Sequence, residues 1–329
     1  MSFRALLTER DDAGLVSSRV QAIDEAALPE GDVVVDVAWA GFNYKDGLCL
    51  TGGGALVRNY PHVAGVDFSG TVRSSSDPRY REGQSVVLTG WRVGEIHWGG
   101  FAQRARVKAD WLVPLPDGLT LRDAMVLGTA GLTAMLAIER LEAAGLKPED
   151  GDVLVTGGSG GVGSLAISLL GRLGYAVTAL SGRPEHEAGL RALGASGFLR
   201  RDDFLAEAAK PLESARWAAA IDNVGGAILG RLLKQVRYGG VVASVGNAGG
   251  IALETNVLPF ILRAVTLIGI DSVMQPTPVR VAAWQRLAGL FDSASYARHV
   301  EEVRLEDLPD AAKRILSGQV HGRVLVRPD

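Results

Sequence analysis

The chain has 329 residues, of which 47% are hydrophobic and 22% charged, and its 34 basic and 37 acidic residues give a net charge of −3. This composition suits two domains with full hydrophobic cores and predicts no basic face for nucleic acid. A single cysteine, Cys49, excludes an internal disulfide and a zinc site made of several cysteines. We find no leader pattern and no apolar run of about 18 residues, so we expect a cytoplasmic protein without a membrane span.

The first third of the chain is expected to be rich in β-strands. Residues 33–38 read as a strand, and further short strands are expected at three places: 69–72, 85–88 and 101–107. The turn-forming sequence Pro-Leu-Pro-Asp-Gly at 114–118 ends this region. A helix is expected over 121–142, with an interruption near 128–131.

Strands and helices alternate from residue 153 onward, which indicates a doubly wound parallel sheet. The expected strands are 153–155, 175–180, 197–199, 218–221, 240–245 and 265–270, and the expected helices between them are 161–173, 185–193 and 226–236. A helix at 279–291 and a strand at 323–326 follow, and we expect this tail to fold back onto the N-terminal region.

The predicted fold class is therefore α/β, with two domains. A β-rich catalytic domain is expected at 1–122, completed by 272–329, and a Rossmann domain is expected at 123–271. The active site is expected in the cleft between them.

The most informative motif is the segment 153–163, which reads Val-Leu-Val-Thr-Gly-Gly-Ser-Gly-Gly-Val-Gly. Its glycines follow a G-x-G-x-x-G frame between an expected strand and an expected helix, which is the pattern of a dinucleotide-binding turn. Glycines let the backbone approach a pyrophosphate, and the helix N-terminus supplies N–H groups to it. The predicted cofactor contacts in this turn are Ser159, Gly160, Gly161, Val162 and Gly163.

The next strand ends in Ser181-Gly182-Arg183, roughly 20 residues after the glycines, where the partner of the adenosine ribose is expected. This place holds a hydroxyl and an arginine instead of a carboxylate, and both match a ribose 2′-phosphate. We therefore predict NADPH as the cofactor, bound by Ser181, Gly182 and Arg183. Arg201, after the following strand, is predicted to add a second cation. Ordinary surface charge is the alternative for both arginines.

Seven short motifs run along the chain: Asn-Tyr-Lys-Asp at 43–46, Leu-Thr-Gly-Trp at 88–91, His-Trp-Gly-Gly at 97–100, Gly-Thr-Ala-Gly at 128–131, Ser-Gly-Arg at 181–183, Pro-Phe-Ile-Leu-Arg at 259–263 and Asp-Ser-Val-Met at 271–274. As a set, they resemble the NADPH-dependent acrylyl-CoA reductase family, in the zinc-free quinone-oxidoreductase-like branch of the medium-chain dehydrogenase/reductase superfamily. The resemblance implies a GroES-like β domain with a Rossmann domain, and a homodimer. It also implies reduction of a short-chain enoyl-CoA, acryloyl-CoA, to propionyl-CoA by NADPH.

The sequence also predicts that the protein works without a metal. Where zinc-dependent relatives carry a Gly-His-Glu stretch, this chain reads Gly65-Val66-Asp67, with valine in place of the histidine. His62 lies outside that register, and Cys49 is expected to be a small buried hydrophobic residue. Three protein ligands for a catalytic zinc are therefore not expected.

The chemistry of an enoyl thioester defines the catalytic candidates. Hydride addition to the β-carbon leaves negative charge on the thioester oxygen, which needs hydrogen-bond donors, and the α-carbon needs a proton. Tyr44 is the predicted donor to that oxygen or the source of the proton. The resemblance places Tyr44 and Asn43 near the nicotinamide, with Asn43 holding the amide or the ribose. A turn containing a buried, hydrogen-bonded Tyr44 is the alternative.

Other residues are predicted to contact the nicotinamide half of the cofactor. The Thr129 hydroxyl is expected to bond the amide or the ribose, or else a carbonyl of its own helix. Strand ends at the carboxyl edge of the sheet supply the remaining candidates: Gly246, Asn247, Ile270 and Ser272. Asp222 and Asn223 end another strand on this edge, or act only as turn formers.

The phosphates of CoA call for a cation, for which Arg58, Arg92 and Arg323 are the candidates. Trp91 and Trp98 are candidates for lining the acyl-CoA cleft, or for packing. Two other functions stay open at this stage: an NADPH-dependent quinone or enone reductase, and an NADPH-binding protein without turnover.

Overall fold

The computed structural model describes residues 1–206 and 210–329 and separates them into two compact units. The first unit comprises Met1–Leu132, Ser272–Gly289 and Ala297–Asp329, and the second comprises Thr133–Asp271 and Leu290–Tyr296. The limits of the folding domains expected from the sequence, 1–122 with 272–329 and 123–271, stay a prediction.

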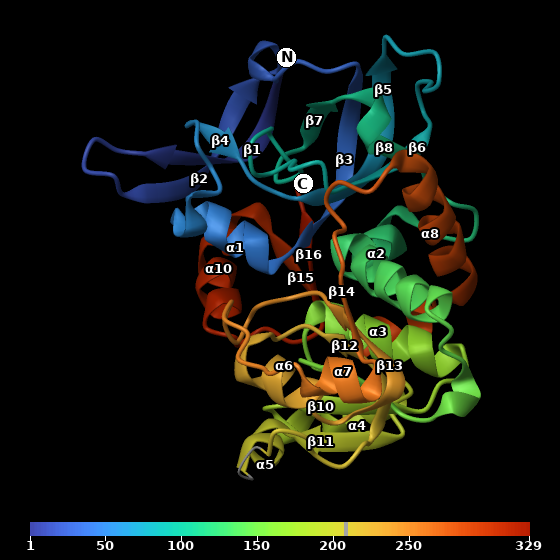
Figure 1. The fold of residues 1–329 in the computed structure, drawn as a ribbon. Helices are drawn as coiled ribbons and strands as arrows, with labels where there is room; N and C mark the ends of the chain where they lie inside the picture. Colours follow the sequence, from blue (N-terminus) through green and yellow to red (C-terminus); the bar gives the residue numbers. More distant parts are fainter. Residues whose placement is uncertain (207–209) are drawn as a thin grey trace. The chain divides into compact units, whose positions relative to one another are not determined.

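The first unit is built mainly on antiparallel β-structure, in which only the pair β15 and β16 is parallel among the described strand pairs (Figure 1). Strands β1 (Ser2–Arg10) and β2 (Val16–Asp24) form a ladder to which β4 (His62–Val63) adds. A larger sheet has the order β15-β16-β3-β5-β6-β8, with β7 also paired to β3. Its strands are β3 (Val33–Phe42), β5 (Asp67–Ser75), β6 (Ser85–Thr89), β7 (Arg104–Val107), β8 (Leu112–Pro114), β15 (Val300–Arg304) and β16 (Arg323–Arg327).

The last strand of the chain lies beside one of the first. Strand β16 pairs antiparallel with β3, and Val324 stands opposite Phe42. Both side chains are buried in the core of this unit, which explains why the tail returns to the N-terminal region. The predicted return of the tail is confirmed.

Four longer helices belong wholly or mainly to this unit: α1 (Tyr44–Thr51), α2 (Leu121–Ala143), α8 (Thr277–Leu290) and α10 (Leu308–Leu316). Helix α2 continues into the second unit and is broken at Gly128, as the sequence predicted. Among the described residues, α2 is the one helix whose length and apolar composition match those of a membrane span. Most of it is buried inside the protein, and buried core helices meet the same criteria, so the match is weak evidence for a membrane location.

The second unit contains a six-stranded sheet with the order β11-β10-β9-β12-β13-β14, in which every neighbouring pair is parallel. The strands are β9 (Val153–Thr156), β10 (Val177–Ser181), β11 (Gly197–Arg200), β12 (Trp217–Asp222), β13 (Val236–Ser244) and β14 (Thr266–Gly269). The described α-helices of this unit are α3 (Gly161–Arg172), α4 (Glu187–Ala192), α5 (Arg201–Ala206), α6 (Gly226–Leu233), α7 (Leu258–Arg263) and the short α9 (Ser293–Tyr296). The predicted Rossmann fold is confirmed.

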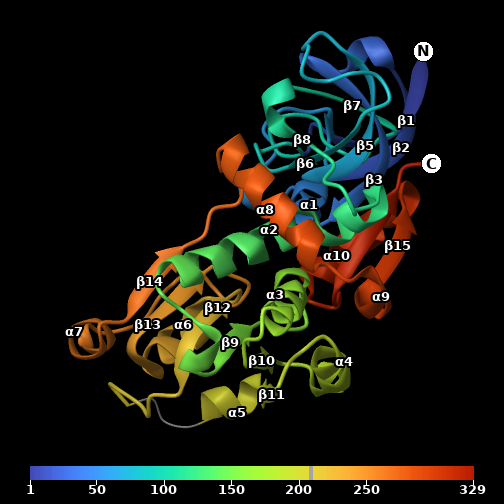
Figure 2. The same ribbon diagram turned by 90° about the vertical axis from the view of Figure 1, so that its right-hand side faces the viewer.

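The order of this sheet fixes where a ligand binds. The chain winds outward from β9 through β10 to β11, and then on the other side from β12 to β14, with α3 and α4 on one face and α6 and α7 on the other (Figure 2). The direction reverses between β9 and β12. Nucleotides bind at the carboxyl ends of the strands at such a switch point.

Two neighbouring elements, α6 and β13, differ clearly from their expected limits. The helix expected over 226–236 ends at Leu233, and the strand expected from residue 240 begins at Val236. Val236 pairs with Trp217, whose indole donates to the side chain of Gln235. These contacts with the neighbouring strand outweigh the helical pattern of the local sequence.

Candidate cofactor and active site

The glycine turn after β9 brings helix α3 close to the preceding backbone. Gly160 is the N-cap of α3, and Gly157 has a left-handed φ of 61°. A Cβ at Gly163 would overlap the carbonyl of Gly157, and one at Gly160 would lie 3.3 Å from the same oxygen. Because the first turn of a helix leaves its N–H groups without helical partners, this arrangement is a cradle for a phosphate anion.

A buried polar atom next to this turn also fits a bound nucleotide. Asn223, just after β12, donates from its side-chain amide and from its backbone N–H to Thr156, at 2.7 and 2.9 Å. Its Oδ1 is buried and receives no hydrogen bond from the described residues. An unsatisfied buried acceptor costs about 1–3 kcal/mol, so this oxygen suits a hydroxyl or amide of a cofactor.

Asp222 organises the same strand end. Its carboxylate accepts hydrogen bonds from the Thr156 hydroxyl at 2.6 Å and from the backbone N–H of Gly225 at 2.9 Å. Burial raises the pKa of this carboxyl, against the effect of those hydrogen bonds. Asp222 is therefore a turn former, which is one of the two roles considered for it.

The residues predicted to bind the 2′-phosphate come together. The Ser181 hydroxyl donates to Ser159 at 3.1 Å and accepts from the backbone N–H of Arg183 at 3.1 Å. A Cβ at Gly182 would lie 3.0–3.2 Å from the guanidinium of Arg201. The glycine thus gives Arg201 room beside the Ser-Gly-Arg turn, where its charge and a serine hydroxyl suit a phosphate.

The other predicted contacts of this unit lie at the same edge of the sheet. The backbone N–H of Gly246 donates to the backbone carbonyl of Asp222 at 3.2 Å, and that of Ile270 donates to the backbone carbonyl of Ser244 at 2.9 Å. The Cα of Asn247 would lie 3.4 Å from a Cβ on Gly225. All three residues follow the carboxyl ends of strands, as predicted, and their roles as cofactor ligands stay a prediction.

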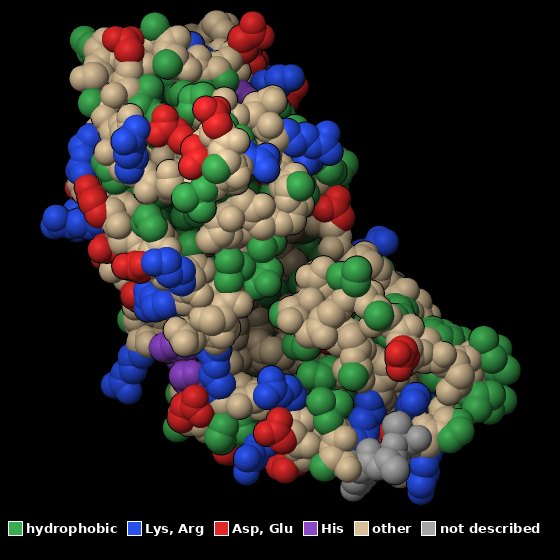
Figure 3. Space-filling view, turned by 90° about the vertical axis from the view of Figure 1, so that its left-hand side faces the viewer, with side chains coloured by type: hydrophobic (Ala, Val, Ile, Leu, Met, Phe, Trp, Pro, Cys, Tyr) green, Lys and Arg blue, Asp and Glu red, His purple; other side chains and the backbone are tan. Residues whose placement is uncertain are grey.

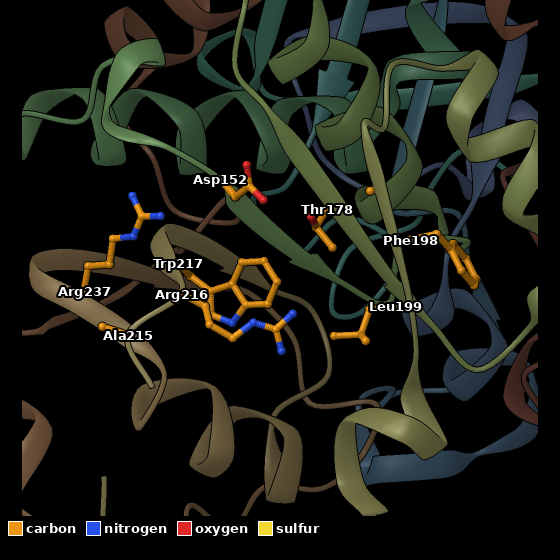
Figure 4. Close-up of a pocket in the computed structure, with 9 residues that line it drawn as sticks. Asp152, Thr178, Phe198, Leu199, Ala215, Arg216, Trp217 and Arg237 are labelled. Atoms are coloured by element: carbon orange, nitrogen blue, oxygen red, sulfur yellow. The ribbon is translucent and has the colours of Figure 1, made fainter. Parts of the chain in front are cut away.

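A cavity of about 420 Å³ lies at the opposite edge of this sheet (Figure 4). Three residues that line it lie at the starts of strands: Asp152 precedes β9, Trp217 begins β12 and Arg237 is the second residue of β13. It is therefore at the amino ends of the strands, away from the glycine turn, and is not the nucleotide site.

The first unit holds Asn43, Tyr44, Thr129 and Ser272. Tyr44 is the first residue of α1 and is 48% exposed, which contradicts the alternative of a buried tyrosine in a turn. The side-chain amide of Asn43 is held within the protein. It donates to Asp46 and Asp67, at 3.3 and 3.1 Å. This geometry favours a role for Asn43 in orienting the start of α1.

The two carboxylates that accept from Asn43, those of Asp46 and Asp67, are buried. Asp46 accepts from the backbone N–H groups of Gly65 and Val66, at 3.1 and 2.9 Å. Burial and then the charge of Asp67 raise the pKa of Asp46 to about 7. Asp67 accepts from the backbone N–H of Thr129 at 2.6 Å. The role of Asp67 was not predicted from the sequence, in which it appears only within the stretch compared with zinc-binding relatives. Gly65 and Gly70, on either side of it, were the signal that the backbone packs closely there.

The structure narrows the candidates for binding CoA. Arg323 is 3% exposed, and it donates to the side chain of Asn43 and to backbone carbonyls. Its prediction as a candidate cation for the phosphates of CoA is therefore wrong. Arg92 pairs with Glu95, whereas Arg58 is exposed. The ring of Trp91 packs 4.8 Å from the guanidinium of Arg280, which is a packing role.

His62 and Cys49, the residues considered as metal ligands, are both buried. The His62 ring is hydrogen-bonded to the carbonyl of Gly94 at 2.9 Å. Cys49 is buried as expected, and burial raises the pKa of its thiol. The described part of the chain contains no group of three His, Cys, Asp or Glu side chains arranged to hold a metal. That the protein works without zinc stays a prediction.

Two families match the two parts of the chain. Residues 29–117 match the alcohol dehydrogenase GroES-like domain, and residues 161–289 match the family described as zinc-binding dehydrogenase. With the Rossmann fold and the nucleotide cradle, these matches define a medium-chain dehydrogenase/reductase.

Relatives that are similar over the full length define the family within this superfamily. The chain is 53% identical to the probable acrylyl-CoA reductase AcuI of Escherichia coli (strain K12), over 98% of this chain and 99% of that protein. It is 52% identical to the acrylyl-CoA reductase AcuI of Ruegeria pomeroyi, over 98% of each chain. It is 46% identical to the putative quinone oxidoreductase YhfP of Bacillus subtilis, over 99% of this chain and 98% of that protein. The chain belongs to the acrylyl-CoA reductase family.

Solved structures agree with this assignment. The E. coli K-12 YhdH structure with bound NADPH has a TM-score of 0.95 at 53% identity, and covers 99% of this chain and 100% of its own. The B. subtilis YhfP structure with NAD bound also has a TM-score of 0.95, at 46% identity and 99% coverage of both chains.

Replacement of Arg183 by alanine tests the 2′-phosphate pocket. We expect Arg183→Ala to weaken NADPH binding about 10- to 100-fold, because one charge-assisted contact is worth roughly 1.5–3 kcal/mol, and to leave NADH binding nearly unchanged. Titration calorimetry with both cofactors measures the two effects. Arg200→Ala, which removes an exposed arginine nearby, is the matched control and should change neither affinity. Equal losses for NADPH and NADH in Arg183→Ala would contradict the assignment.

Proposed function

We propose that this protein reduces the 2,3 double bond of acryloyl-CoA to propionyl-CoA with NADPH. The observation that carries the proposal is full-length similarity, above 50% identity, to two proteins named as acrylyl-CoA reductases. The cluster of Ser181, Gly182, Arg183 and Arg201 supports the phosphorylated cofactor. The substrate class is a short-chain enoyl-CoA.

The reaction consumes acryloyl-CoA, NADPH and one proton and gives propionyl-CoA and NADP⁺. When bound, NADPH supplies the hydride that adds to the β-carbon. The protein then has two tasks: to stabilise negative charge on the thioester oxygen, and to deliver a proton to the α-carbon.

Tyr44 is the residue best placed for these tasks in the first unit. Its phenol is half exposed, and it stands at the N-terminus of α1, where the helix dipole favours negative charge. We assign to the Tyr44 hydroxyl the hydrogen bond to the thioester oxygen. Asn43 orients Tyr44 through its bonds to Asp46 and Asp67.

Turnover of a substrate panel tests the proposal. Purified protein with NADPH is expected to oxidise the cofactor on addition of acryloyl-CoA, with a higher kcat/KM than for a soluble quinone. The quinone is the second candidate substrate, because one relative is named as a putative quinone oxidoreductase. A preference for the quinone contradicts the proposal. Tight NADPH binding without turnover of either acceptor identifies a protein that only binds the nucleotide.

The variant Tyr44→Phe tests the catalytic assignment. Loss of one hydroxyl donor is expected to lower kcat for acryloyl-CoA about 100-fold, the usual effect of removing a donor to a developing oxyanion. NADPH affinity should change little. Tyr60→Phe, on a partly buried tyrosine outside the predicted contacts, is the control. An unchanged kcat in Tyr44→Phe would contradict the assignment.

We further propose that the protein is a cytoplasmic homodimer whose copies meet at α7. This helix and the preceding loop expose Ile251, Ile261 and Leu262 by 88, 67 and 58%. Figure 3 shows hydrophobic side chains gathered on one edge of the molecule. Strand β14, next to α7 in sequence, ends the described sheet. An exposed apolar patch beside a sheet edge suits a second copy of the chain.

Sedimentation velocity tests the dimer. The wild type is expected to sediment at twice the chain mass, and Ile261→Glu is expected to give a monomer, because it places a charge in the apolar patch. Val279→Glu, on the partly exposed helix α8, should remain dimeric. A monomeric wild type, or a dimeric Ile261→Glu, would contradict this interface.

A further inference from the structure

The break in helix α2 leaves peptide groups that a continuous helix would pair. At Gly128 the backbone has φ 50° and ψ −150°, a conformation that is largely restricted to glycine. In a continuous helix the N–H of residue 129 would bond to the carbonyl of residue 125. The break therefore leaves a carbonyl end on the first half of α2 and an N–H end on the second half, and buried peptide groups of this kind need other partners.

Two buried charged side chains supply those partners. The Asp67 carboxylate, from the start of β5, accepts from the N–H of Thr129 at 2.6 Å. The Arg323 guanidinium, from the start of β16, donates to the carbonyl of Val126 at 2.9 Å and to that of Met125 at 3.4 Å. Asp67 and Arg323 are 0 and 3% exposed.

Both side chains fill the gap in the helix. A Cβ at Gly128 would lie 2.6 Å from an oxygen of Asp67 and 2.9 Å from a terminal nitrogen of Arg323. The signs of the charges match the two helix ends, since an anion is favourable at an N-terminus and a cation at a C-terminus. The pair therefore caps both halves of the broken helix.

The same pair holds Asn43. The Asn43 amide donates to Asp67 at 3.1 Å, and its carbonyl oxygen accepts from Arg323 at 3.0 Å. Asn43 is the N-cap of α1, and Tyr44 follows it directly. These two buried side chains thus fix the positions of two separate backbone segments, those that carry Thr129 and Tyr44.

We propose that Asp67 and Arg323 are positioning residues of the reductase, which set the places of Thr129 and Tyr44 by capping the broken helix and holding Asn43. This inference rests on the proposed function, in which Tyr44 contacts the substrate, and on the predicted contact of Thr129 with the cofactor. Neither Asp67 nor Arg323 touches the reacting atoms. A shift of about 1 Å in a reacting group lowers a rate by as much as 100-fold, so the pair acts on hydride transfer through geometry.

Conservative variants test this role. Asp67→Asn replaces one acceptor oxygen by a donor that faces N–H groups, and Arg323→Lys offers a single ammonium where a guanidinium reaches three acceptors. The matched controls are Asp36→Asn and Arg104→Lys, which alter a partly exposed ion pair of 3.1 Å between β3 and β7. Melting temperature establishes that each variant is folded.

The decisive readout is the isotope effect on kcat with NADPH deuterated at C4 of the nicotinamide. For Asp67→Asn and Arg323→Lys we expect kcat to fall about 100-fold and the isotope effect to rise, because misplaced reactants make hydride transfer rate-limiting. A purely structural role would change the fraction of folded enzyme and leave the isotope effect unaltered. Variants that match the controls in both kcat and isotope effect overturn the proposal.

Hydrogen exchange of the wild-type protein gives a test that needs neither a folded variant nor turnover. The Thr129 amide is expected to exchange as slowly as amides of the core strands, because it is bonded to a buried carboxylate. Exchange at the rate of an exposed loop would overturn the proposal. Failure of the proposed function is seen separately, as absent turnover of acryloyl-CoA in the wild type and in the control variants.

Discussion

The close approach of helix α3 to the carbonyl of Gly157 is the constraint on which the cofactor site depends. Only a residue without a side chain fits at Gly163, and this lets the first turn of α3 lie directly over the end of β9. The turn that results also carries Ser159, whose hydroxyl accepts from Ser181 at the end of β10. One short segment thus connects the place for the pyrophosphate with the place for the 2′-phosphate.

Both units contain helix ends whose peptide groups have no partners within the helix, and these groups are satisfied in different ways in the two units. In the second unit, the N-terminus of α3 is left open for an anionic ligand. In the first unit, the ends created by the break in α2 are closed by the protein's own charges, Asp67 and Arg323. An uncompensated buried charge would be costly, but here each charge has hydrogen-bonded partners. The first arrangement binds a ligand, and the second fixes geometry.

The sequence predicted the parts of the fold that depend on local pattern. The apolar run of β9, the glycine frame and the helix after it are continuous in sequence. Arg201 lies beside Gly182, and its role as a second cation for the 2′-phosphate stays a prediction. Helix α1 was not expected, because eight residues that include lysine, aspartate and glycine give a weak helical pattern. That Asp67 and Arg323 both serve the break in α2 could not be predicted from spacing, because the pairing of β16 with β3 joins strands that are far apart in sequence. Arg323 was instead considered as a surface cation.

Calorimetry with fragments of the cofactor tests the central claim most directly, because it isolates the phosphate from the rest of the molecule. Adenosine 2′,5′-bisphosphate and AMP differ by the 2′-phosphate alone. If Ser181, Arg183 and Arg201 form the pocket for that group, the wild-type protein will bind the bisphosphate about 10- to 100-fold more tightly than AMP. Equal affinity for the two fragments would contradict the account.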